Sequence, residues 1–264
     1  MGRPESATTH DRGGTAHVAD RMAKAHAAAG RGDYPAALAI WGPLAHAGVA
    51  RAQNNIGACF AEGLGLERDY QLALRWLTLA AEAGDPVGQR NLAALYFKGE
   101  GVEQDNVRAA DLYRAAAESG DGPSQDMLSW MLLEGETVPF NAGEARRWAL
   151  AAAEQGIASA MTRLGMIYHN ALDVERDPRT AAAWWIKAAA RGDADGQAML
   201  GAAYILGAGV ARDGVAALSW LIRARTGGSA LAERFLKTAR NSITADEIAE
   251  AERRATSPLP EPAP

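Results

Sequence analysis

The sequence is short of cysteine, of aromatic residues and of long apolar runs. Among its 264 residues there is one cysteine, Cys59, which excludes an internal disulfide framework. Aromatic residues make up 6% of the chain, and no apolar run reaches the roughly 18 residues needed to cross a bilayer. The net charge of -5 and the isoelectric point of about 5.6 argue against a broad nucleic-acid-binding face, which would be basic. We therefore expect no transmembrane segment and no nucleic-acid partner.

Motifs that carry chemistry are equally scarce. The sequence contains no HExxH, CxxC or GxSxG motif. No ligand spacing relates the five histidines, which are His10, His17, His26, His46 and His169. The glycine pairs 63/65, 99/101 and 207/209 follow predicted helices rather than strands, so turn geometry explains them better than phosphate binding. We therefore expect no catalytic residue, no metal and no cofactor, and we interpret Cys59 as a buried, inert thiol.

Both ends of the chain have the composition of extended segments. Residues 1–15 lack the apolar stretch of a secretory signal, so we expect a disordered N-terminal segment and a cytoplasmic protein. Four prolines fall within the last eight residues, which read SPLPEPAP. Because proline interrupts the hydrogen bonding of helices and strands, residues 256–264 are predicted to form a Pro-rich disordered tail.

What the sequence has in abundance is glycine and alanine, and both recur at a fixed distance. Glycine returns every 36 residues, at Gly48, Gly84, Gly120, Gly156, Gly192 and Gly228. The same step relates a small column, which consists of Ala73, Ala109, Ala145, Ala181 and Ala217. A bulky column follows three residues later, at Trp76, Leu112, Trp148, Trp184 and Trp220. Small residues let helices approach closely, so the bulky column is predicted to fill the groove beside each contact.

One unit, residues 86–121, shows what is repeated. Asp85 can cap a first helix and Asp105 a second one. Leu92 and Tyr96 share one face of the first helix, and the stretch KGEGVEQD separates the two helices. Two short antiparallel helices per unit predict an all-α fold of stacked helical hairpins.

These columns resemble the Sel-1-like repeat, a relative of the tetratricopeptide repeat. The fifth unit carries the pattern most fully, in Gly196, Leu200, Gly201, Tyr204, Gly207, Gly209, Val210, Asp213, Ala217, Trp220 and Gly228. The resemblance covers five units over residues 50–228 and implies a right-handed superhelical α-solenoid of 36-residue helix-turn-helix repeats. Residues 16–49 are expected to form a cap-like opening helical pair. Residues 229–255 are expected to form C-terminal capping helices, the last of which opens with a capping box between Thr244 and Glu247.

The third and fourth units depart from the turn pattern. Thr137 and Asp173 replace the second turn glycine of their units, and Ala171 replaces the first one of the fourth unit. A threonine held at positive φ would be strained, so a locally different loop is predicted at Thr137. The fourth unit also opens with Gly156 and Ile157, and therefore lacks the capping aspartate.

Positions on the first helices that vary between units are candidates for a binding surface. In related helical hairpin repeats, the first helices line a concave groove that holds peptides. The candidate partner-binding residues are Arg90, Phe97, Lys98, Asp126, Trp130, Leu133, Met166, His169 and Ile205. Their apolar members suit a peptide or an amphipathic helix, and they also suit packing between units, so both interpretations stay open. His169 is interpreted as an ordinary surface histidine rather than a pH switch or a ligand.

The predicted function is that of a non-catalytic scaffold or adaptor that binds a protein or peptide partner on the concave face. Two alternatives stay open. One is an exported Sel-1-like protein that binds a cell-wall ligand or hydrolyses a substrate, although this chain lacks the cysteine pairs of some secreted members linked to β-lactams. The other is a self-associating structural element, whose groove is filled by its own tail or by a second copy.

Overall fold

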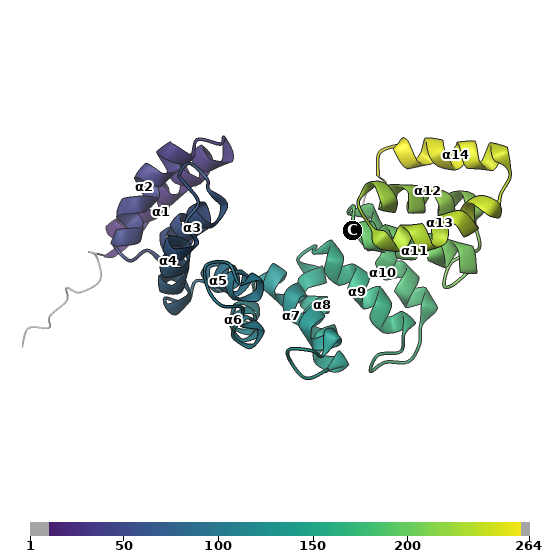
Figure 1. The fold of residues 1–264 in the computed structure, drawn as a ribbon, viewed down its shortest axis with the longest axis horizontal. Helices are drawn as coiled ribbons and strands as arrows, with labels where there is room; N and C mark the ends of the chain where they lie inside the picture. Colours follow the sequence, from purple (N-terminus) through teal and green to yellow (C-terminus); the bar gives the residue numbers. More distant parts are fainter. Residues whose placement is uncertain (1–10, 260–264) are drawn as a thin grey trace, which may run out of the picture. The chain divides into compact units, whose positions relative to one another are not determined.

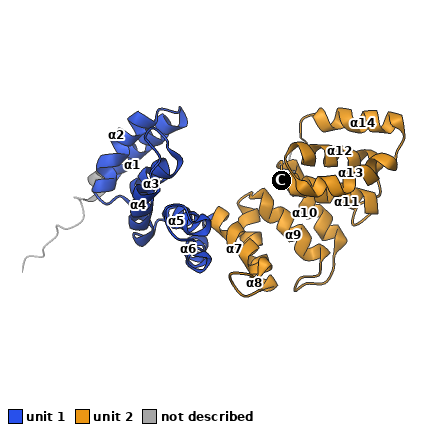
Figure 2. Ribbon diagram, viewed as in Figure 1, with its two compact units in different colours: residues 1–121 blue, residues 122–264 orange. Residues whose placement is uncertain are grey.

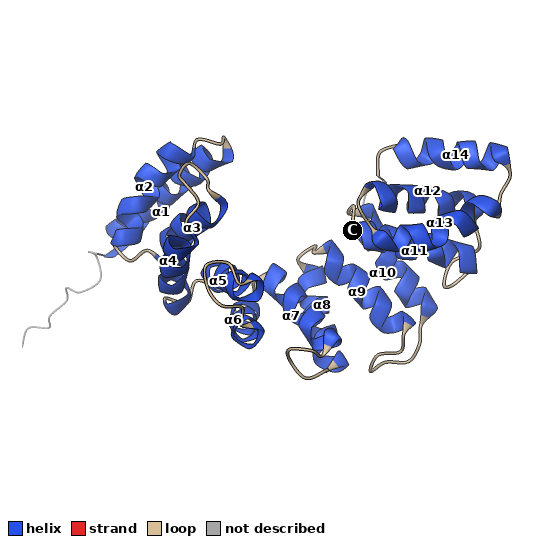
Figure 3. Ribbon diagram, in the orientation of Figure 1, coloured by secondary structure: helices blue, strands red, loops and turns tan. Residues whose placement is uncertain are grey.

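The computed structural model describes residues 11–259, which form fourteen α-helices and no strand (Figure 1, Figure 3). The helices are α1 (Asp11–Gly30), α2 (Tyr34–His46), α3 (Ala50–Glu62), α4 (Tyr70–Glu82), α5 (Pro86–Lys98), α6 (Asn106–Glu118), α7 (Gly122–Glu134), α8 (Ala142–Glu154), α9 (Ala158–His169), α10 (Pro178–Ala190), α11 (Ala194–Leu206), α12 (Gly214–Thr226), α13 (Ala230–Asn241) and α14 (Ala245–Thr256). The predicted all-α solenoid of 36-residue helix-turn-helix repeats is confirmed.

The chain divides into two compact units, residues 1–121 and residues 122–264 (Figure 2). Unit 1 contains α1–α6, and unit 2 contains α7–α14. Within each unit, a helix packs against its hairpin partner, and the first helices of successive hairpins also pack against one another. In unit 1, such contacts join α3 to α5. In unit 2, they join α7 to α9, α9 to α11 and α11 to α13. The side chains of these helices that point away from the second helices form what we call the first-helix face of each unit.

Aspartate side chains start most of the repeat helices, as the sequence predicts. Asp105 Oδ1 accepts the amide hydrogen of Arg108 at 2.9 Å, and Asp213 Oδ1 accepts that of Ala216 at the same distance. Each such bond satisfies one of the amide groups that the first turn of a helix leaves without a partner. Ile157 starts α9 without a side-chain cap, so the predicted lack of a capping aspartate is confirmed.

In four of the five repeats, the turn inside the hairpin uses left-handed backbone conformations at two positions. In the fifth repeat these are Gly207 and Gly209, with φ of 69° and 81°. The fourth repeat keeps both conformations without glycine, at Ala171 with φ of 57° and Asp173 with φ of 54°. Thr137 avoids positive φ, so the predicted change of loop in the third repeat is confirmed.

The small and bulky columns differ in burial. All five alanines of the small column are fully buried, as expected for close contact between helices. The bulky column is only half-buried: Trp76, Trp184 and Trp220 pack against the buried clusters without being enclosed by them. Trp184, for example, has Lys187 Nζ 4.9 Å from its ring centroid, while the adjacent Trp185 is 1% exposed. On each second helix, the buried position is therefore the one immediately after the bulky column, as at Trp185.

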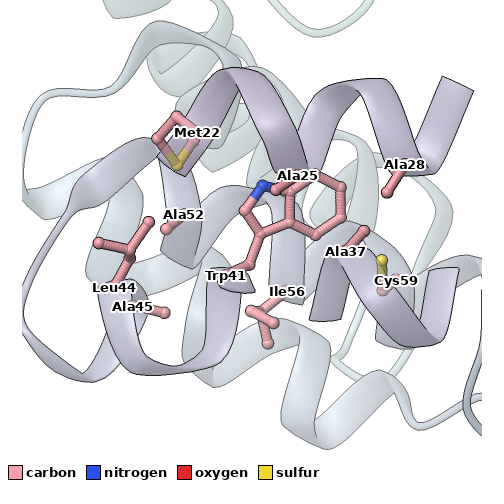
Figure 4. Close-up of a cluster of buried hydrophobic side chains, with 10 residues drawn as sticks. All are labelled: Met22, Ala25, Ala28, Ala37, Trp41, Leu44, Ala45, Ala52, Ile56 and Cys59. Atoms are coloured by element: carbon pink, nitrogen blue, oxygen red, sulfur yellow. The ribbon is translucent and has the colours of Figure 1, made fainter. Parts of the chain in front are cut away.

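The core of unit 1 runs from the opening helical pair into the first repeat (Figure 4). Trp41 lies at the centre of this cluster, between Ala25 of α1 and Ile56 of α3. Cys59 is 2% exposed, so its predicted burial is confirmed. Burial raises the pKa of the Cys59 thiol from 9.0 to about 11.

The opening helix begins earlier than the sequence suggests. Residues 11–15 belong to α1, although they fall in the segment predicted to be disordered. Further along α1, Val18 and Met22 pack on the core of unit 1. Extending a helix from such an anchored segment adds a hydrogen bond per residue, whereas starting one is costly. The rest of that segment, residues 1–10, lies outside the described residues.

At the other end, α13 and α14 both pack against α12. The predicted capping box is present, since the side chain and backbone of Thr244 exchange hydrogen bonds with Glu247. After α14, Arg223 Nη2 donates to the carbonyl oxygen of Ser257 at 2.6 Å. The remainder of the predicted tail, residues 260–264, lies outside the described residues.

Candidate binding site

The first-helix face of unit 2 is hollowed into a pocket of about 330 Å³, which we call the first-helix pocket. Its lining consists of Trp130 and Glu134 of α7, Ser159, Thr162, Arg163 and Met166 of α9, Asp193 and Asp195 at the start of α11, and Leu231 of α13. Two larger hollows, of about 540 and 450 Å³, lie beside hairpin turns and are lined mainly by turn residues. The first-helix pocket differs from them in combining three large apolar side chains with several carboxylates.

Helical spacing brings the lining residues of each helix together. Trp130 and Glu134 are four residues apart on α7, and Thr162 and Met166 are four apart on α9. Residues at this spacing lie one turn apart on the same helix face. The stacking of α7, α9 and α11 then places these two faces next to the first residues of α11.

Hydrogen bonds between successive first helices fix the walls of the pocket. Asp126 accepts Ser159 Oγ at 2.6 Å and Arg163 Nη2 at 3.1 Å, which ties α7 to α9. Thr162 Oγ1 donates to Asp193 Oδ2 at 2.6 Å and so ties α9 to the start of α11. The side chains of Asp126 and Arg163 are 15% and 16% exposed, so this ion pair is largely shielded from water.

Four of the predicted binding residues lie on α7 or α9 at or near the pocket, in different roles. Trp130 and Met166 line it, and Met166 is 39% exposed. Asp126 lies behind the lining, in the ion pair with Arg163. Leu133 is half-buried and does not belong to the lining.

The last two predicted residues of unit 2 take part in packing. Ile205 packs against the buried cluster formed by α11–α14. His169 is half-buried, with its ring centroid 5.5 Å from that of Trp185, and so differs from the surface histidine that the sequence suggested. For Ile205, the packing interpretation therefore describes the structure better than the groove interpretation.

The three predicted residues of unit 1 belong to α5. Arg90 Nη1 lies 2.7 Å from Asp121 Oδ1, in an ion pair between the first helix of the second repeat and the last residue of that repeat. Phe97 is half-buried, and Lys98 Nζ lies 3.9 Å from Glu100 Oε2 at the exposed end of the helix. Arg90 is therefore already paired with a carboxylate of unit 1.

Of the lining residues, only Trp130 and Met166 are among the predicted binding residues; the predicted set does not contain Glu134, Ser159, Thr162, Arg163, Asp193, Asp195 or Leu231. Asp193 occupies a position that the repeat pattern explains as a helix start, so its second role carries no separate signal, and Asp195 belongs to no repeating column. Leu231 follows the last repeat, where the pattern stops. The structure was needed to show that these residues face Trp130 and Met166.

Neither a metal site nor a membrane span emerges from residues 11–259. In that range no group of three or more histidine, cysteine or acidic side chains could hold a metal ion. No helix in the same range is both long and apolar enough to cross a membrane.

Comparison with protein families gives a clear match. A family model described as Sel1 repeat matches residues 50–85, 86–121, 122–157, 158–193 and 194–229. The five matched segments begin with or immediately before α3, α5, α7, α9 and α11, so each contains one hairpin. A search of curated proteins found no match.

Solved structures include similar chains. The Sel1 repeat protein from Oxalobacter formigenes is 27% identical, with a TM-score of 0.79 over 92% of this chain and 99% of that chain. The immunity protein Pa5087 from Pseudomonas aeruginosa is 24% identical, with a TM-score of 0.47 over 78% of each chain. The protective antigen c5321 from uropathogenic Escherichia coli, described as displaying an SLR fold, is 25% identical, with a TM-score of 0.38 over 84% of this chain and 63% of that chain. Of the three, the first superposes well, and the comparison of folds rests on it.

Proposed function

This chain belongs to the Sel1 repeat family, and on that premise we propose that it is a non-catalytic adaptor that binds another protein or a peptide on its first-helix face. Sel1 repeat proteins are generally protein-interaction scaffolds, and their solenoid fold is typically non-catalytic. Because a fold by itself does not fix a function, the proposal has to be supported by the residues of a particular site.

The observation that carries the proposal is the first-helix pocket. Met166 is a large apolar side chain left 39% exposed, and it shares the pocket with Trp130 and Leu231. Apolar side chains that converge in a hollow on a helical surface are typical anchoring points for peptides and helices. The structural positions of the repeat do not require these three residues to meet there.

The pocket is also held rigidly. The bonds from Asp126 to Ser159 and Arg163, and from Thr162 to Asp193, fix α7, α9 and the start of α11 relative to one another. A preformed site spends less conformational entropy when a partner binds than a site that must first become ordered. This rigidity supports a role in recognition.

A pair of matched variants tests the proposal. Met166 on α9 and Ile186 on α10 are both exposed apolar residues, at 39% and 42%, but only Met166 lies in the pocket. Wild type, Met166→Gln and Ile186→Gln are immobilised and used to capture partners from an extract of the source cells. We expect a partner that is retained by wild type and by Ile186→Gln and is lost by Met166→Gln, with unchanged circular dichroism.

Two results would contradict this proposal. A partner captured equally by all three proteins would place binding elsewhere. Light scattering that shows a stable dimer, broken by Met166→Gln and not by Ile186→Gln, would mean that the pocket serves self-association instead.

A further inference from the structure

We propose that the first-helix pocket recognises a basic segment of a protein partner, in which a lysine or arginine lies next to an apolar residue. This inference rests on the proposed function and names the chemistry of its partner. It follows from the charge left in the pocket, from the acceptor atoms that remain available, and from the apolar surface around them.

The charges of the pocket do not balance. Three of its lining residues are acidic, Glu134, Asp193 and Asp195, and one is basic, Arg163. The charge of Arg163 is already matched by Asp126, whose Oδ1 lies 3.1 Å from Arg163 Nη2. The pocket therefore presents negative charge to a ligand, and an acidic peptide or a nucleic acid would be repelled.

The dipoles of α7 and α11 affect the charges of the pocket carboxylates in opposite ways. Asp193 caps α11 through the amide of Gly196 at 2.7 Å, so the positive end of that helix offsets its charge. Glu134 is the last residue of α7, where the negative end of the helix adds to its charge. Its exposed carboxylate makes no hydrogen bond or ion pair within residues 11–259. Asp195 also lies in the first turn of α11, so Glu134 is the main uncompensated charge.

Asp195 keeps a free acceptor atom. Its Oδ1 accepts the hydroxyl of Ser229 at 2.5 Å, which orients the carboxylate, while Oδ2 has no hydrogen-bond donor in the described part of the chain. A lysine ammonium or an arginine guanidinium consists only of donors, and it therefore complements such oxygens.

The apolar lining suits the rest of a basic side chain. Trp130, Met166 and Leu231 border the same hollow as the carboxylates. Lysine and arginine carry long aliphatic stems that pack on apolar surface while the charged end stays near polar groups. An indole ring also attracts a cation that lies over its face. A neighbouring apolar residue of the partner would fill the remaining surface beside Met166.

A random library of displayed peptides of about twelve residues tests the preference without assuming a sequence. The library is selected on full-length wild type and, in parallel, on Trp130→Ala, whose fold is checked by circular dichroism. We expect peptides that depend on Trp130 to be enriched in lysine or arginine adjacent to leucine, methionine or an aromatic residue.

The outcomes separate the two proposals. Trp130-dependent peptides that are neutral or acidic would overturn the basic preference while the proposed function stands. If no peptide depends on Trp130, both proposals fail for this pocket.

Charge variants then test the carboxylate directly on one selected peptide. Glu134→Gln should weaken its binding about threefold and Glu134→Lys about tenfold, because a partly exposed ion pair contributes a modest free energy. Glu62 is the matched control, since it is exposed and ends α3 as Glu134 ends α7. Glu62→Gln and Glu62→Lys should leave the affinity unchanged. Equal effects at both positions would show a general charge effect and overturn the assignment to this pocket.

Discussion

At the scale of single residues, packing within the hairpins of the first, fourth and fifth repeats depends on a glycine of the first helix that faces a bulky residue of the second. A Cβ atom at Gly165 would overlap the indole of Trp185, and one at Gly201 would lie 2.7 Å from Cγ of Leu221. In the third repeat, the position equivalent to Gly165 is Ser129, and the one equivalent to Trp185 is Ala149. A smaller residue on the second helix thus accompanies a larger one on the first, as expected at constant interior density.

Cys59 leads to a prediction about alkaline pH. Its pKa is raised from 9.0 to about 11 by burial, so the folded protein keeps the proton after the unfolded chain has lost it. The stability from this group is complete below pH 9 and is lost as the pH rises toward 11. Between pH 9 and 10, the free energy of unfolding should fall less steeply with pH for Cys59→Ala than for wild type. The two slopes should differ by at most about 1.4 kcal/mol per pH unit. Urea titrations across this range measure the two slopes, and equal slopes would contradict the prediction.

At the scale of helices and turns, the aspartate before a first helix has two roles. Asp85 Oδ1 caps α5 through the amide of Gly88 at 2.7 Å, while Asp85 Oδ2 lies 2.6 Å from Nε of Arg51 on the preceding first helix, α3. Asp193 likewise caps α11 and accepts a hydrogen bond from Thr162 on the preceding first helix, α9. Variable positions near the start of the first helices, such as Arg51 and Thr162, therefore supply partners for these aspartates.

Two glycines of unit 2 test how turns pack between repeats. Gly209 and Gly228 both have positive φ, but a Cβ at Gly209 would overlap the carbonyl group of Pro178, whereas nothing lies within 4 Å of one at Gly228. Gly228→Ala should lower the free energy of unfolding by about 1 kcal/mol, through backbone strain alone. Gly209→Ala should lower it by about 2–4 kcal/mol, because a steric clash is added.

Denaturant unfolding of the two variants, with unchanged slope against urea, provides the measurement. Similar losses for both glycines would mean that the turn of the fifth repeat moves away from Pro178 at little cost.

At the scale of the molecule, the repeats leave apolar surface at both ends of the array, and additional helices cover it. In unit 1, Met22 and Trp41 from α1 and α2 complete the cluster that includes Ile56 of α3. In unit 2, α13 and α14 pack on α12, and Ala251 of α14 is fully buried there. A stack of repeats needs such terminal elements because an open end would expose its core.

The last helix provides the corresponding prediction. Ala251→Asp places a carboxylate in the cluster that contains Leu218 and Leu221, and should lower the free energy of unfolding by about 3 kcal/mol or more. Its neighbour Glu250 is half-exposed and pairs with Arg253 and Arg254 at the surface, so Glu250→Ala is a control that should change stability little. Thermal unfolding compares the variants, and equal losses would show that α14 does not bury the core.

The sequence by itself determined the repeat length, the helix starts and the all-α fold. These features depend on residues a few positions apart, such as Asp213 with Ala216, or Thr244 with Glu247, and local geometry decides them. Thr137 could be interpreted in the same way, because positive φ is costly for threonine wherever it occurs.

Only the tertiary structure decided which side chains meet between stacked hairpins and their neighbouring helix starts. Arg90 pairs with Asp121 across 31 residues, and Arg163 pairs with Asp126 across 37, so two predicted binding positions serve stability. The same stacking brings Leu231 to Trp130 and leaves the bulky column half-buried. A periodic pattern specifies which face of a helix is apolar, but the rotation and offset between stacked hairpins select the partner of each side chain.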